Sequence, residues 1–328
     1  MERDDIFRAI QAAISNTPLL MVGSGSSAAY QLPGMKELGE HLLGKLDLKY
    51  SGQGCWDVFR KNLLAGQDLE TALSNITFSQ EILDDVKCET WNLISSNDLK
   101  LLGRILFENF DFPLAKLLKK LYQAHPQKLD VITTNYDRVI EYACDFADIP
   151  VTTGLEGYYL KRFKGTFRSK NAVNLIKVHG SLDVFRDSHG ATVSLPTQGK
   201  LPSGLIPEII TPGRSKYEAV LQGTPRQLLV AADEKIGQAN SFLCIGYGFN
   251  DTQIQENILA KARTGIPIVV LTKEVSEHAA HLLANNTQNY ISLQEGKEKD
   301  TTEVCMNREI EILDGTFWTV DGFMEIIA

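Results

Sequence analysis

The stretch PLLMVGSGSS, residues 18–27, joins a compact apolar run to a turn of glycine and serine. An apolar run of this length that ends at glycine is typical of a buried parallel strand. Glycines in such a turn let the backbone approach a pyrophosphate, and the next helix offers its free N–H groups to that anion. Position 28 is alanine where the full glycine fingerprint has a third glycine, so alone the turn fits a phosphate cradle or an ordinary tight turn.

Strands and helices alternate along most of the remaining chain. Apolar runs predict further strands at 129–133, 173–178, 241–245 and 266–271, and apolar residues at helical spacing predict helices at 35–43, 140–147, 228–236 and 251–262. Residues 56–122 are predicted to be mostly helical, and residues 182–212 are predicted to be irregular. Alternating strands and helices imply a parallel sheet with helices on both faces. The predicted fold class is α/β: one domain, residues 1–328, with a Rossmann-like parallel sheet and a helical insertion at about 45–125 that forms a second lobe.

The charge and hydropathy of the chain exclude several classes of protein. Its 328 residues carry 33 basic and 41 acidic side chains, a net charge of −8, which argues against a surface that grips a nucleic-acid backbone. A basic cluster at 161–170 is read as a solvated loop. The longest apolar runs are too short to cross a bilayer, and the first ten residues lack the apolar stretch of a signal peptide. We expect a cytoplasmic protein that binds neither membrane nor nucleic acid directly.

The five cysteines are scattered and form no Cys-x-x-Cys pair. They are Cys55, Cys88, Cys144, Cys244 and Cys305. This pattern excludes a cysteine-rich zinc site and suggests a reducing compartment, so no metal is expected.

Three more polar or glycine-rich segments follow predicted strands. They are TTNYD at 133–137, KVHGS at 177–181 and GYGFND at 246–251. In parallel sheets, ligands bind outside the carboxyl ends of the strands. These segments and the first glycine turn therefore predict one binding site along that edge.

Each segment also has a simpler structural interpretation when taken alone. Asp137 and Asp251 fit the caps of the helices that follow them, and Asn135 fits a turn. A single histidine such as His179 is more often structural than catalytic. Four such segments at one edge of a sheet are harder to explain in this way.

In this order, the motifs Gly-x-Gly-x-Ser, Thr-x-Asn-x-Asp, His-Gly-Ser and Gly-x-Gly resemble the sirtuins. They look most like the bacterial sirtuin-like NAD hydrolases of anti-phage defence, because segment 246–251 looks like that branch rather than the protein deacylases. The resemblance covers roughly residues 18–272. It implies that Asn135 positions the nicotinamide ribose and a water, that Asp137 contacts the carboxamide, and that His179 is the catalytic base. It also implies NAD contacts from Gly23, Ser24, Gly25, Ser26, Ser27, Thr134, Gly246, Tyr247, Gly248 and Asn250.

The chain departs from the deacylases at two places. No cysteine lies between Cys144 and Cys244, where deacylases carry a four-cysteine zinc module, and Pro33 is followed by Gly-Met-Lys rather than Asp-Phe-Arg. Both differences argue against peptide binding more than against NAD binding.

The expected activity is therefore hydrolysis of NAD, as substrate, to nicotinamide and ADP-ribose, with some cyclic product left open. The alternatives are an NAD-dependent protein deacylase and a non-catalytic module that binds NAD or ADP-ribose. Because depletion of NAD kills the cell, such an enzyme must be inactive until needed, and we expect control through homo-oligomerisation, a separate partner or both. A HerA-like ATPase is a candidate partner by family analogy alone. The apolar residues of the tail, 309–327, fit either an interface or a segment that docks on the sheet.

Overall fold

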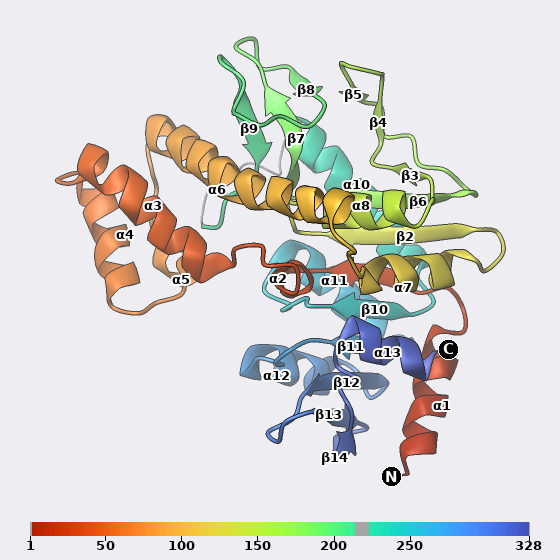
Figure 1. Ribbon diagram of the computed structural model, residues 1–328. Coiled ribbons are helices and arrows are strands. Elements are labelled where there is room, and N and C mark those ends of the chain that lie inside the picture. The colour runs from red at the N-terminus through yellow and green to blue at the C-terminus, as the bar shows by residue number, and fades with distance from the viewer. Residues whose placement is uncertain (1, 214–222, 328) are drawn as a thin grey trace.

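A nine-stranded sheet runs through the computed structural model, which describes residues 2–213 and 223–327 (Figure 1). Its order is β14-β13-β12-β11-β10-β1-β2-β6-β3, and all neighbours are parallel except β12–β13 and β13–β14. The strands are β1 (Leu19–Val22), β2 (Lys128–Thr133), β3 (Val151–Thr152), β6 (Ala172–Lys177), β10 (Phe242–Ile245), β11 (Ile268–Leu271), β12 (Tyr290–Glu295), β13 (Thr301–Met306) and β14 (Glu309–Asp314). The predicted parallel sheet is confirmed, because its central strands are the continuous apolar runs seen in the sequence.

The strand order reverses next to β1. From β1 the chain builds outward through β2 and β6, and later returns to add β10, β11 and β12 on the other side. The crevice between β1 and β10 is therefore the switch point of the sheet, which is where ligands of such folds bind.

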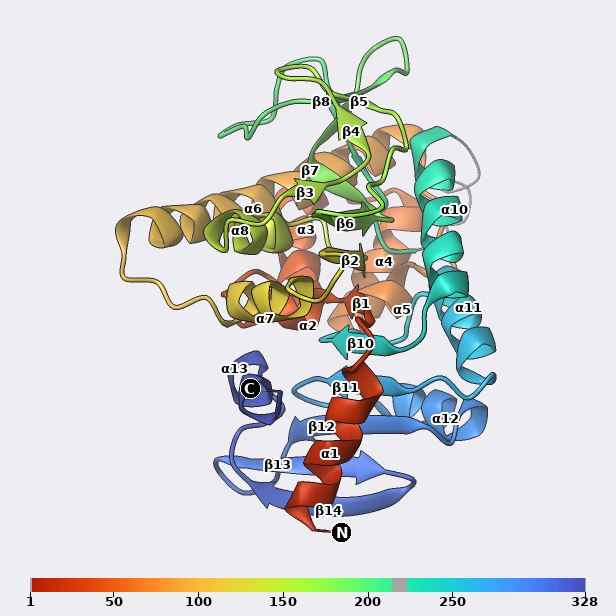
Figure 2. The ribbon, with the colours of Figure 1, turned by 90° about the vertical axis from the view of Figure 1, so that its right-hand side faces the viewer.

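Helices cover both faces of the sheet (Figure 2). One face is covered by α1 (Arg3–Ile14), α7 (Pro113–Tyr122), α8 (Val139–Phe146) and α13 (Val320–Ile326), and the other by α10 (Gly223–Gln238), α11 (Thr252–Ala262) and α12 (Glu277–Asn286). The predicted apolar stripes point inward, since Leu114, Leu118, Ala232 and Ile236 are all buried. None of the helices in residues 2–213 and 223–327 combines the length and apolar character needed to cross a membrane.

A helical lobe projects beside the sheet, at the left of Figure 1. It contains α3 (Met35–Tyr50), α4 (Gly54–Leu64), α5 (Leu69–Leu73) and the start of α6 (Gln80–Phe107); the short α2 (Ser24–Ala28) precedes it at the sheet. The lobe has its own core around Tyr50, Trp56 and Phe59. The far half of α6 and all of α7 pack into the main core instead. The insertion boundaries at about 45–125 stay a prediction.

The interpretation of residues 182–212 as irregular was wrong for three short strands. They belong to an antiparallel sheet in the order β8-β7-β9, formed by β7 (Gly180–Arg186), β8 (Thr192–Ser194) and β9 (Ile206–Ile209), and β4 (Leu155–Glu156) pairs with β5 (Arg162–Phe163) nearby. These strands are short and separated by turn formers, so no local pattern revealed them. Non-local contacts hold them, such as the indole of Trp91 on α6, which donates to the carbonyl of Leu182 at 2.7 Å.

One part of the tail, residues 309–327, docks on the sheet, and another part is exposed. Phe317, Phe323 and Ile326 are buried in the main core, so this part docks on the sheet. Ile310 and Ile312 lie on the edge strand β14 and are 61% and 52% exposed.

Candidate functional site

The glycine turns after β1 and β10 meet backbone to backbone at the switch point. The N–H of Gly25 donates to the carbonyl of Gly246 at 3.1 Å. A Cβ on Gly23 would lie 2.4 Å from that same carbonyl oxygen, and a Cβ on Gly246 would lie 2.2 Å from the nitrogen of Ser26. Gly246 also has φ +56, a conformation that favours glycine. Both turns therefore need glycine for their mutual contact.

Asn135 is fixed by the end of β2 and by the first glycine turn. Thr133 Oγ1 donates to the carbonyl of Val22 at 2.8 Å and accepts the N–H of Asn135 at 3.0 Å. The Nδ2 of Asn135 donates to the Gly23 carbonyl and to Ser27 Oγ, both at 3.0 Å. The side-chain amine is thus held within the protein, and the amide oxygen is the acceptor that Asn135 can offer a ligand.

Asp137 lies beside Asn135, with its carboxyl buried. Its Oδ1 accepts the N–H of Val139 at 3.2 Å, but the N-cap of α8 is Arg138, so the interpretation of Asp137 as the helix cap was wrong. Burial raises the pKa of Asp137, while the Lys177 ammonium and a hydrogen bond from Ser27 act in the opposite direction. Lys177 is itself buried, where it donates to the backbone carbonyl of Asp137 and to Glu141.

His179 follows β6 and faces the start of α11. Its backbone carbonyl accepts the N–H of Ile210 at 2.9 Å, and its Nε2 lies 2.5 Å from Oδ2 of Asp251. The side chains of His179 and Asp251 are only 10% and 4% exposed. Asp251 is the N-cap of α11, as predicted, since its Oδ1 accepts the N–H of Gln253 at 3.1 Å.

A cavity of about 250 Å³ lies over these residues, and nearly all the predicted site residues line it. The predicted residues that line it are Gly23, Ser24, Ser27, Thr134, Asn135, Asp137, His179, Gly246, Tyr247, Gly248 and Asn250. Gly25 and Ser26 are not in this lining: Gly25 contacts Gly246, and Ser26 donates to the Gly23 carbonyl at 2.7 Å. The role assigned to each residue stays a prediction.

Other residues line the cavity without a sequence signal. The helical lobe contributes Leu38 from α3, Glu70 from α5 and Ile94 from α6, and the segment after β9 contributes Ile210 and Pro212. These positions are ordinary helical or loop residues in the sequence, and only the packing of the lobe over the sheet edge brings them here. Asp251 also lines the cavity; its place after the fourth strand was the available signal, but it was interpreted only as a helix cap.

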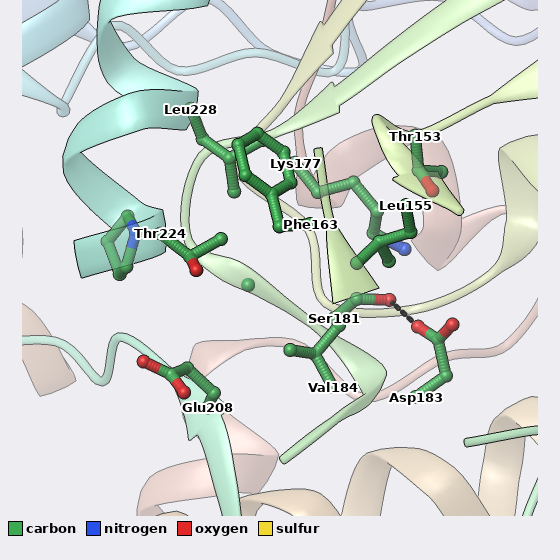
Figure 3. A pocket seen from close by; sticks show the side chains of 12 residues that line it. Thr153, Leu155, Phe163, Lys177, Ser181, Asp183, Val184, Glu208, Thr224 and Leu228 are labelled. Carbon is green, nitrogen blue, oxygen red and sulfur yellow. Dashed lines mark hydrogen bonds between the residues drawn. The ribbon is translucent and has the colours of Figure 1, made fainter. Parts of the chain in front are cut away.

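A second cavity lies between α10 and the antiparallel sheet (Figure 3). It includes Phe163, Leu228 and the hydrogen-bonded pair of Ser181 and Asp183, whose oxygens are 2.5 Å apart. Its volume is about 30 Å³, room for about two water molecules, which is too small for a nucleotide. The larger cavity is therefore the candidate site.

Within residues 2–213 and 223–327, no group of three histidine, cysteine or acidic side chains has the arrangement of a metal site. The five cysteines are free, and burial raises the pKa of Cys88 to about 11. Independence from zinc remains a prediction.

Comparison with known proteins gives a consistent result. A family model described as a SIR2-like domain matches residues 130–305. A solved Sir2 homologue, a mutant in complex with ADP-ribose, has a TM-score of 0.51 at 15% identity, and the match covers 100% of this chain and 96% of that one. A structure reported for the mechanism and regulation of Sir2 enzymes gives 0.50 at 14% identity, covering 99% and 98%. At such identities the likeness shows the fold. No curated protein matches the chain.

Proposed function

The chain belongs to the SIR2-like domain family, and on that premise we propose that it hydrolyses NAD to nicotinamide and ADP-ribose. The observation that carries the proposal is the meeting of Asn135, Asp137 and His179 in one cavity at the switch point of the sheet. Dinucleotides bind at this point in folds of this kind.

The chemistry of the three side chains suits this reaction. Loss of nicotinamide leaves a ribose with oxocarbenium character, so the site must orient the sugar and control access of water. The side-chain Nδ2 of Asn135 is held by two hydrogen bonds, so its amide oxygen can orient the ribose and a water. Asp137 can receive the carboxamide of nicotinamide. His179 can take a proton from the attacking water.

Deacylation is the second candidate, and the stretch between Cys144 and Cys244 favours hydrolysis over it. Deacylases carry their zinc module there, whereas this chain has no cysteine and forms the β8-β7-β9 sheet. A module that only binds NAD would have no need of a base such as His179 at the cavity wall. By the same resemblance we propose a role in NAD depletion during anti-phage defence, in a homo-oligomer and with a partner such as a HerA-like ATPase.

The test is chromatography of NAD incubated with the purified protein, with and without candidate activators. We expect nicotinamide and ADP-ribose to appear together. His179→Gln should lower the rate by about 10²–10⁴-fold, the range for loss of a proton-transfer group. Asn135→Ala should also lower the rate, because it removes the amide that orients the ribose and the water. His189→Gln is the matched control, because His189 is an exposed histidine in a turn.

Two results would contradict the proposal. Nicotinamide release that requires an acyl-lysine peptide would identify a deacylase. Calorimetric NAD binding without turnover, in the presence of every activator, would identify a binding module.

A further inference from the structure

The contact between His179 and Asp251 joins residues that lie 72 positions apart in the sequence. His179 follows the end of β6, and Asp251 begins α11 after β10. The Nε2 and Oδ2 atoms approach to 2.5 Å, and both side chains are almost fully buried. The two atoms do not meet the angles of an aligned hydrogen bond, as is common in catalytic pairs before a ligand binds.

Asp251 is held in place independently of His179. Its second oxygen accepts the N–H of Gln253 at 3.1 Å, which fixes the carboxylate at the start of α11. The helix is anchored in the core by Ile254 and Ile258, which are 1% and 0% exposed. The carboxylate is therefore held at a fixed place in the cavity wall.

Asp251 lies at the N-terminus of α11. The N-terminus of a helix stabilises an anion through its free N–H groups and its dipole. Tyr247 and Tyr136 lie close by. Burial and the charge of Asp251 raise the pKa of Tyr247, and burial with the charges of Glu70 and Asp251 raises the pKa of Tyr136. Both phenols are therefore neutral. Because they carry no negative charge, the Asp251 carboxylate has no rival in these side chains for the N–H proton of His179. Among the described residues, the other acidic side chains on this cavity wall are Asp137 and Glu70.

We propose that Asp251 is the positioning residue of His179, an inference that rests on the proposed hydrolysis of NAD. The carboxylate holds the imidazole proton on Nε2, which leaves Nδ1 as the basic nitrogen. It then stabilises the imidazolium that forms when Nδ1 receives a proton, as an acidic partner does for other catalytic histidines.

The oxygen of a water molecule bonds to the anomeric carbon of the nicotinamide ribose, and one of its protons moves to Nδ1 of His179. The carbon–nitrogen bond breaks, and its electron pair neutralises the charge of the nicotinamide ring. The products are nicotinamide, ADP-ribose and a protonated His179 whose charge is compensated by Asp251.

Asp251→Asn tests the proposal, because asparagine caps a helix as well as aspartate does but carries no charge. We expect a folded protein whose kcat for nicotinamide release falls by about 10²–10⁴-fold, with little change in KM for NAD. We also expect a displaced acid limb in the pH profile. Asp251→Glu should restore part of the rate, whereas Asp251→Ser, which also caps, should not.

Asp68→Asn is the matched control. Asp68 is the N-cap of α5 and accepts the N–H of Thr71 at 2.9 Å, away from His179. The same exchange there should leave kcat and the pH profile as in the wild type. A purely structural role for Asp251 predicts that stability changes while the pH profile keeps its form.

A second measurement does not depend on activity. Nitrogen-15 NMR of labelled histidine reports which ring nitrogen carries the proton, and the His179→Gln variant identifies the signals of His179. We expect the wild type to hold the proton on Nε2 and Asp251→Asn to lose this preference. Wild-type signals and a wild-type pH profile in Asp251→Asn would overturn the proposal. A changed tautomer in a protein that never cleaves NAD would uphold the pairing and refute the proposed function.

Discussion

The two glycine turns of the site require glycine because their backbones contact each other. The turn after β1 and the turn after β10 approach so closely that neither Gly23 nor Gly246 has room for a Cβ. The buried carboxyl of Asp137 is a second feature of single residues, because its burial opposes its own charge. Each feature gives a prediction.

Gly246→Ala should destabilise the protein and lower its affinity for NAD. The left-handed backbone alone costs about 1–3 kcal/mol with a side chain, and the clash with Ser26 adds to it. Chemical denaturation measures the loss. Gly103→Ala is the control, since Gly103 lies within α6 with open space around it and should gain about 0.5–1 kcal/mol. Equal stability of the two variants would refute the argument.

Asp137→Asn should stabilise the fold at neutral pH while it impairs nicotinamide release. Because the pKa of Asp137 is raised on folding, the folded state holds more protons than the unfolded state just above the ordinary carboxyl range. Stability therefore falls as pH rises through that window, and a neutral side chain avoids the loss. At neutral pH we therefore expect a higher Tm for Asp137→Asn than for the wild type.

Calorimetry at several pH values checks this. The difference between Asp137→Asn and the wild type should shrink as pH is lowered towards the ordinary carboxyl pKa. A difference that stays constant with pH would show that the charge is not its cause.

At the scale of elements, a buried ion pair ties the helical insertion to the site. Asp98 on α6 is fully buried and accepts from the backbone N–H of Arg138 at 2.8 Å, from its guanidinium at 2.6 Å and 2.9 Å, and from the hydroxyl of Tyr142 at 2.6 Å. Arg138 directly follows Asp137, so α6 fixes the loop that carries Asn135 and Asp137.

Asp98→Ala should cost about 3–5 kcal/mol of stability, because it leaves the Arg138 guanidinium buried without its partner. NAD affinity should fall with it, measured by calorimetry at a temperature where the variant is folded. The control is Asp5→Ala, which removes the exposed pair with Arg8 and should change stability by at most about 1 kcal/mol. A small loss on Asp98→Ala would mean that α6 does not support the site.

At the scale of the whole molecule, β14 forms the open edge of the large sheet. Exposed strand edges tend to pair with another chain, and Ile310 and Ile312 are exposed on this one. Acidic neighbours, Glu309 and Glu311, oppose pairing of the edge with itself. Despite these charges, the exposed side chains of Ile310 and Ile312 make this edge one place where the expected oligomer can form.

Light scattering coupled to size exclusion should show a homo-oligomer at micromolar concentration. If β14 contributes, the double change of Ile310 and Ile312 to Glu should shift the population towards monomer and lower activity. A monomer that cleaves NAD fully and without a partner would contradict both the oligomer and the regulation that we infer from it.

The sequence by itself determined the parallel sheet and the turns that carry the site. Buried strands appear in the sequence as apolar runs, and polar residues such as Asn135 and His179 follow those strands. The sequence alone therefore predicted that the site lies at the carboxyl ends of the strands. These signals are local: each strand and its turn lie within about ten residues.

Only the tertiary structure decided the features that depend on distant partners. The β8-β7-β9 sheet, the cavity wall built from Leu38 and Ile94, and the contact of Gly25 with Gly246 have no local pattern. In the sequence, Asp251 is one helix cap among several. It becomes the partner of His179 because β6 ends and α11 begins at the same edge of the sheet. The packing of the strands between them sets the distance between the two side chains.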